Sequence, residues 1–124
     1  MKLLGLLSGF VFVFLYGCNG SGSSVIKTDI EVEIFNQSTI DMENAHVVFG
    51  KYICKWGWVS KSTSKGYMFY PHPITADAEL HWDEVSGHRM EKIDLRKIYL
   101  PGKSGRLTFT VYDDRVEVAF REKP

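Results

Sequence analysis

Apolar residues recur at every second position along most of the chain from Thr28 onward, and no stretch keeps the 3.6-residue spacing of an amphipathic helix. The clearest case is the segment Ala76–Asp83, in which apolar and polar residues alternate strictly. Successive side chains of a strand point to opposite faces, so this segment is predicted to be a half-buried strand. Its inward residues are Ala76, Ala78, Leu80 and Trp82, and its outward residues are Asp77, Glu79, His81 and Asp83.

The same alternation predicts strands on both sides of this segment. A third strand is expected over Tyr52–Val59, a fourth over Tyr67–Tyr70, and one after the Ser86-Gly87 turn over His88–Leu95. Pro71 and Pro73 end the fourth, because proline donates no hydrogen bond to a sheet ladder, and they predict a crossing between sheets. The other expected inward sets are Ile30, Val32 and Ile34; Ala45, Val47 and Phe49; Leu107, Phe109 and Val111; and Val116, Val118 and Phe120.

These short strands, about seven to eight in number, are separated by turn signals every eight to twelve residues or so, which is typical of an all-β domain. The predicted fold is a sandwich of two antiparallel sheets, immunoglobulin-like or transthyretin-like in general shape, over residues 26–124. A small β-barrel is the alternative. The length and the 44% share of hydrophobic residues fit one domain with its own core.

The beginning of the chain differs in pattern from the rest. Lys2 is followed by 14 uncharged, mostly apolar residues, Leu3–Tyr16, which is typical of a secretory signal peptide over residues 1–17. A transmembrane helix needs about 20 apolar residues, and the Gly/Ser-rich stretch that follows cannot extend this run. The segment is therefore expected to direct export rather than to span a membrane permanently.

The end of this run, Leu15-Tyr16-Gly17-Cys18, resembles the lipobox of bacterial lipoproteins. The resemblance implies cleavage before Cys18, diacylation of its thiol and anchoring to a membrane of the cell envelope. Asn19 implies delivery to the outer membrane, facing the periplasm, if the organism is Gram-negative. Residues 18–25 would then form a flexible tether spanning roughly 15 Å. The alternative is an ordinary signal peptide cleaved near Gly17, which leaves Cys18 as a free thiol.

A wider set of features is similar to small bacterial lipoproteins that have a single β-sandwich and no established activity. The set comprises Asn36-x-Ser38, Val48-Phe49-Gly50, Gly57, Tyr67, Ala76 with Ala78, and Gly105. This resemblance covers most of the mature chain and implies the fold without implying a function.

Charge narrows the possible partners. The chain has 15 Lys and Arg against 15 Asp and Glu, and the signs alternate instead of forming blocks. No basic field is present to bind nucleic acid, so nucleic-acid binding is not expected. We expect a monomer without a cofactor, with the membrane as partner through lipid on Cys18 and with a protein or glycan of the envelope as a further partner.

Four residues with side chains that can act as metal ligands are expected to lie close together. Glu79, His81 and Asp83 share one strand face, and His88 follows across the expected hairpin. Alternate strand residues lie about 6.6–7 Å apart, which is wide for one coordination shell, and a solvated sheet face commonly carries such residues. They are therefore weak candidates, and no metal site is assigned to them.

The segment YICKWGWV places Tyr52, Cys54, Trp56 and Trp58 on one predicted face. If this face is outward, its aromatic rings offer a contact surface for a sugar, peptide or protein, with Trp56 and Trp58 at its centre. If it is inward, it is core. Cys54 is expected to be a small buried thiol, because acylation of Cys18 would leave it without a partner.

Tyr52-x-Cys54 and Ser86-Gly87-His88-Arg89 are similar to membrane-bound C-type lysozyme inhibitors, which insert a loop of this kind into the enzyme, although Met90 stands where that family has tyrosine. The leading hypothesis remains a membrane-anchored lipoprotein with a non-enzymatic binding or envelope-structural domain. The alternatives are a metal-dependent envelope protein or enzyme that uses the four candidate ligands, and a lysozyme-inhibitor-like lipoprotein.

Overall fold

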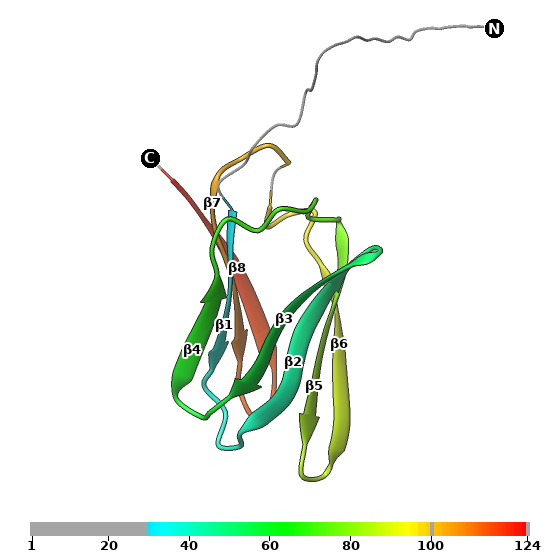
Figure 1. The fold of residues 1–124 in the computed structure, drawn as a ribbon, viewed down its shortest axis with the longest axis vertical. Coiled ribbons are helices and arrows are strands. Elements are labelled where there is room, and N and C mark those ends of the chain that lie inside the picture. Colours follow the sequence, from blue (N-terminus) through cyan, green and yellow to red (C-terminus); the bar gives the residue numbers. More distant parts are fainter. Residues whose placement is uncertain (1–29, 100, 124) are drawn as a thin grey trace, which may run out of the picture.

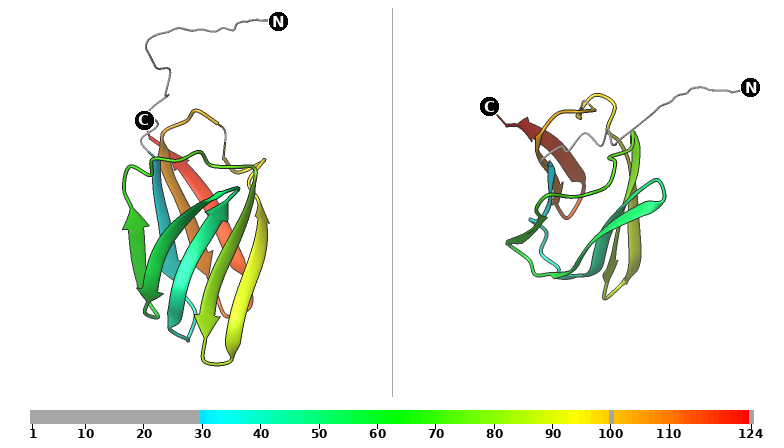
Figure 2. Two further views of the ribbon diagram at one scale, coloured as in Figure 1. Left: turned by 45° about the vertical axis from the view of Figure 1, so that its right-hand side comes forward. Right: turned by 45° about the horizontal axis from the view of Figure 1, so that its top comes forward.

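A computed structural model describes residues 30–99 and 101–123, which form two four-stranded sheets facing each other (Figures 1 and 2). The strands in chain order are β1 (Ile30–Asn36), β2 (Met42–Phe49), β3 (Tyr52–Val59), β4 (Thr63–Tyr67), β5 (Asp77–Glu84), β6 (Gly87–Asp94), β7 (Gly105–Val111) and β8 (Val116–Glu122). The described residues contain no helix, so the all-β prediction is confirmed.

The strand order is β4-β1-β7-β8 in the first sheet and β3-β2-β5-β6 in the second. The two sheets are separate, so the described residues form a sandwich and not the closed barrel that was the alternative. In immunoglobulin constant domains the first strand shares a sheet with the second. Here β1 pairs with β4 and β7 instead, so the strand order is not that of an immunoglobulin constant domain.

One strand pair departs from the predicted antiparallel arrangement. β1 and β7 pair in parallel, from Ile30 opposite Gly105 to Asn36 opposite Val111, whereas every other strand pair in the described residues is antiparallel. Parallel neighbours cannot be joined by a tight hairpin. The pairing is possible here because five other strands separate β1 from β7 along the chain.

The chain changes sheets on both sides of β4. It leaves the second sheet after β3, adds β4 to the edge of the first sheet, and returns to the second sheet at β5. Pro71 and Pro73 lie in the return segment, which runs across one end of the sandwich in Figure 1. The predicted crossing at this proline pair is confirmed.

The core lies between the sheets and is filled by the inward side of each alternating pattern. In β5, Ala78, Leu80 and Trp82 are at most 3% exposed, and Phe49 and Phe109 are fully buried opposite one another. The predicted inward sets of the first, second and seventh strands are confirmed by the same measure. Burial of these side chains, at about 1.5–3 kcal/mol each, supplies the main driving force for folding.

The bounds of one strand and the orientation of one alanine were predicted wrongly. The fourth strand was expected over Tyr67–Tyr70 but runs from Thr63 to Tyr67. All five of its residues are exposed, so no apolar alternation marks it, and it forms because it pairs with the edge of β1. Ala76 was expected to be inward, but it is exposed and lies just before β5.

The segments predicted to be the signal peptide, residues 1–17, and the lipidated tether, residues 18–25, lie outside the described residues. No helix long and apolar enough to cross a membrane occurs in the part of the chain that the structure describes.

Candidate functional site

The four weak metal-ligand candidates meet on the outer face of the second sheet. Cross-strand pairing places His81 opposite Met90 and Asp83 opposite His88, so the side chains of β5 and β6 interleave. The contacts run in one line. Glu79 Oε1 lies 3.1 Å from His81 Nε2, His81 Nδ1 lies 3.0 Å from His88 Nε2, and His88 Nδ1 lies 2.7 Å from Asp83 Oδ1. The hairpin thus brings together residues that a single strand would keep apart.

Two further residues join this cluster from β2. The ring of His46 stacks on that of His81, with centroids 4.9 Å apart and planes within 1° of parallel. His46 Nδ1 lies 2.7 Å from the main-chain oxygen of Asn44, and the Asn44 side chain donates to Asp83 Oδ2 at 2.9 Å. We call the set Glu79, His81, Asp83, His88, His46 and Asn44 the histidine cluster.

The hydrogen bonds of the histidine cluster change the pKa of the Asp83 carboxyl. The hydrogen bond from the Asn44 amide, followed by that from His88, lowers the pKa of the Asp83 carboxyl below its ordinary value. Asp83 is therefore an ionised acceptor at neutral pH. It fixes the His88 ring from one side, as Glu79 does the His81 ring.

Sequence reasoning missed His46 and Asn44. His46 is an outward residue of an alternating strand, so its orientation could be read from the sequence, but its neighbour depends on the register between β2 and β5. That register is interrupted by a bulge between Glu43 and His46, where Asn44 adopts a positive φ of 51°. Neither the bulge in β2 nor the pairing of β2 with β5 can be predicted from the local sequence.

Trp56 and Trp58 do not share a face. Trp56 is 8% exposed and donates from Nε1 to the main-chain oxygen of Val32, whereas Trp58 is 49% exposed and donates to Ser60 Oγ. The reason is an irregular register around Gly57, which has a φ of 80°. The irregularity reverses the alternation, so Val59 and not Trp58 faces the core. Of the two candidate contact residues, Trp56 is core and Trp58 is surface.

Cys54 is a free thiol, 1% exposed, on the inner face of β3. Burial raises the pKa of the Cys54 thiol to about 12. A thiol of this kind is almost wholly protonated at neutral pH and packs as a small apolar side chain.

The segment Ser86-Gly87-His88-Arg89 lies at the β5–β6 hairpin. Glu84 pairs with Gly87, so the turn consists of Val85 and Ser86 alone, and Val85 is fully exposed at its tip. His88 belongs to the histidine cluster, and the Arg89 guanidinium lies 5.3 Å from the Trp82 ring centroid. The segment is thus part of a tight hairpin and not of a protruding loop.

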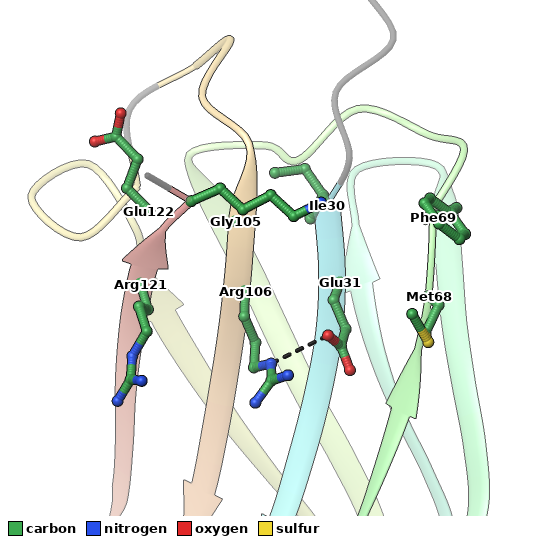
Figure 3. Close-up of a pocket in the computed structure, with 9 residues that line it drawn as sticks. Ile30, Glu31, Met68, Phe69, Gly105, Arg106, Arg121 and Glu122 are labelled. Carbon is green, nitrogen blue, oxygen red and sulfur yellow. Dashed lines mark hydrogen bonds and ion pairs between the residues drawn. The ribbon is translucent and has the colours of Figure 1, made fainter.

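A shallow pocket of about 240 Å³ lies at the end of the first sheet where β1 begins (Figure 3). Arg106 Nε contacts Glu31 Oε1 at 3.1 Å on its floor. Met68 and Phe69, more than 60% exposed, line the side toward β4. Met68 and Phe69 were expected within a strand, whereas both follow the end of β4.

Among residues 30–99 and 101–123, no group of three or more His, Cys, Asp or Glu side chains is arranged to hold a metal ion. The candidate lipidation residue, Cys18, lies outside these residues. No protein family and no curated protein matches the chain.

The structure is similar to the NMR structure of a protein from Eubacterium rectale. The TM-score is 0.52 and the sequence identity 14%, over 82% of this chain and 97% of the other. A likeness at this identity shows a shared fold and carries no information on function.

Proposed function

We propose that the chain is a lipid-anchored protein of the bacterial cell envelope whose β-sandwich binds a partner without catalysing a reaction. The anchor is supported by the leader and by the lipobox-like Leu15-Tyr16-Gly17-Cys18. Lipid attachment at one cysteine with two or more chains holds a protein stably on a membrane, whereas a single chain does not.

The binding part of the proposal is supported by one observation about the second sheet. Its outer face carries Ile53 and Trp58 on one edge strand and Met90 on the other, each between 42% and 50% exposed. The histidine cluster lies between these edges. Protein interaction surfaces are enriched in large aromatic and Met side chains, which lie beside hydrogen-bonding groups.

The position of this face relative to the chain's start also supports the proposal. Ile30, where the described part begins, lies at the same end of the sandwich as the β2–β3 turn, while β3 runs away from that turn toward Trp58 (Figure 1). Six residue steps of a strand from Tyr52 place Trp58 about 20 Å farther along. A domain anchored through its N-terminus would therefore present Trp58 and the β5–β6 hairpin away from the bilayer.

The binding face is tested by comparing surface variants of the full-length chain displayed on intact envelopes. Partners recovered by cross-linking should be lost from Trp58→Ala and Ile53→Ser and kept by Val85→Ala, which removes an exposed apolar side chain at the hairpin tip. Equal recovery from all three variants would show that this face does not bind the partner.

A further inference from the structure

The contacts of His81 and His88 determine which of their ring nitrogens carry a hydrogen. An ionised carboxylate only accepts hydrogen bonds, so the nitrogen facing each carboxylate must carry the hydrogen: Nε2 in His81 and Nδ1 in His88. A neutral imidazole has only one N–H. The two remaining nitrogens, which face each other at 3.0 Å, would then both present lone pairs.

Two lone pairs at this distance repel unless a cation lies between them. A shared proton supplies one positive charge, which leaves the two carboxylates of Glu79 and Asp83 and the two imidazoles of His81 and His88 with a net charge of about −1. A divalent ion would bring the same four groups to neutrality. The four groups alone would therefore match the charge of a divalent cation, and this reasoning does not depend on the proposed function.

We infer that His81 Nδ1 and His88 Nε2 form a two-imidazole site for a divalent transition-metal ion such as Zn²⁺ or Ni²⁺. Metal–imidazole bonds of about 2.0–2.1 Å at a tetrahedral angle place the two nitrogens about 3.3 Å apart, close to the distance in the structure. To bind one ion, the two nitrogens must move slightly apart and their lone pairs must turn off the line that joins them. The His88 side chain is 53% exposed and has room for this turn, whereas the His81 side chain is 19% exposed.

The surroundings of the pair match those of ligand histidines. A metal-bound histidine usually donates its second N–H to a carboxylate, which fixes its tautomer and ring orientation. Glu79 does this for His81 and Asp83 does it for His88. His46 adds a parallel ring that packs against His81.

Imidazole nitrogen is a preferred donor for Zn²⁺, Cu²⁺ and Ni²⁺, whereas Mg²⁺ and Ca²⁺ prefer oxygen. Two protein donors leave the other coordination positions for water or for a donor atom of a second molecule. The site is therefore open, in the sense of a metal that can bridge to a partner or substrate.

Binding should weaken as the pH falls, because protons compete for the same nitrogens. The charged and titratable groups around the site on this face are Glu43 and His46 from β2, Lys55 from β3 and Lys92 from β6, together with the two carboxylates. Raising the ionic strength screens the exposed lysines and leaves this competition in place.

The test is a titration of the full-length chain, carrying Cys18→Ser and solubilised in non-ionic detergent, with ZnCl₂ or NiCl₂ against a competing chelator. The Cys18→Ser change removes a thiol that would bind the same ions. One ion should bind per chain. His81→Gln or His88→Gln should abolish binding, and Asp83→Asn should weaken it by about 10–100-fold.

His72→Gln is the matched control, because His72 is exposed and stacks on Tyr52 away from the cluster. It should bind as the parent does. Absence of binding in the parent, or binding that persists in both His81→Gln and His88→Gln, would overturn the inference. A shared proton seen in the imidazole ¹⁵N spectrum without any metal uptake would overturn it as well. Thermal unfolding of each variant confirms that losses arise at the site and not from unfolding.

Discussion

Replacement of Asn36 by alanine tests how the turn between β1 and β2 is held. Asn36 is fully buried, and its side chain makes four hydrogen bonds. Its Nδ2 donates to the main-chain oxygens of Ile40 and Val59, at 2.9 and 3.0 Å. Its Oδ1 accepts from the Ser38 amide and hydroxyl, at 3.0 and 2.6 Å. One side chain therefore joins β1, the turn and the end of β3.

The cost of Asn36→Ala follows from these contacts. Each of the four hydrogen bonds contributes about 1 kcal/mol net, so we expect a loss of about 4 kcal/mol in the free energy of unfolding. For a domain of this size the melting temperature should fall by roughly 16–32 °C. Urea denaturation followed by circular dichroism measures the free-energy change.

Gln37→Ala is the matched control for this prediction. Gln37 is exposed, and its tie to β7 is a main-chain bond to the Val111 oxygen that alanine retains. The free energy of unfolding should change by no more than about 0.5 kcal/mol. A loss below about 1 kcal/mol for Asn36→Ala would refute the reasoning, because it would mean that the four hydrogen bonds add almost nothing to stability.

Three further predictions address other parts of the domain. Trp56→Ala should lower the free energy of unfolding measured by urea denaturation by about 3–5 kcal/mol, because it empties a core position, whereas Trp58→Ala should change it by no more than about 0.5 kcal/mol. Equal losses would contradict the assignment of Trp56 to the core and Trp58 to the surface. Burial raises the pKa of the Cys54 thiol from 9.0 to about 12. The stability that the protonated Cys54 thiol contributes to the fold is therefore complete below pH 9 and is lost as the pH rises toward 12. Cys54→Ala should flatten the fall in the free energy of unfolding measured across that range. Gly105→Ala should destabilise the domain by about 1–3 kcal/mol in the same assay, because the added Cβ would lie in contact with the Arg121 main-chain oxygen, and an unchanged stability would show that β8 shifts freely.

The sequence was sufficient to predict those strands in which one face is buried. In β5 the apolar alternation is uninterrupted, and in β1 and β7 it indicates the buried apolar residues, although the buried Asn36 at the end of β1 breaks it. The bounds of β4 could not be predicted because an exposed edge strand contains no such alternation. The reversal of faces in β3 could not be predicted from the sequence. A bulge at Gly57 shifts the alternation of inward and outward side chains by one residue, and a glycine in a strand does not reveal the direction of that shift.

The histidine cluster was only partly predictable for a related reason. Alternation placed Glu79, His81 and Asp83 on one face, and the hairpin turn placed His88 near them. Their actual contacts depend on side-chain directions across the β5–β6 pair. The contribution of His46 depends on the neighbouring strand, which is 35 positions away from His81 in the sequence. Long-range register of this kind is set by packing of the whole sheet and not by local residues.

The measurement that tests the proposed lipid anchor most directly is the intact mass of the chain extracted from bacterial membranes. We expect a mature protein that begins at Cys18 and carries the added mass of its lipid, and we expect Cys18→Ser to abolish both the added mass and the membrane association. A wild-type chain that is unmodified at Cys18 and recovered in the soluble fraction would contradict it.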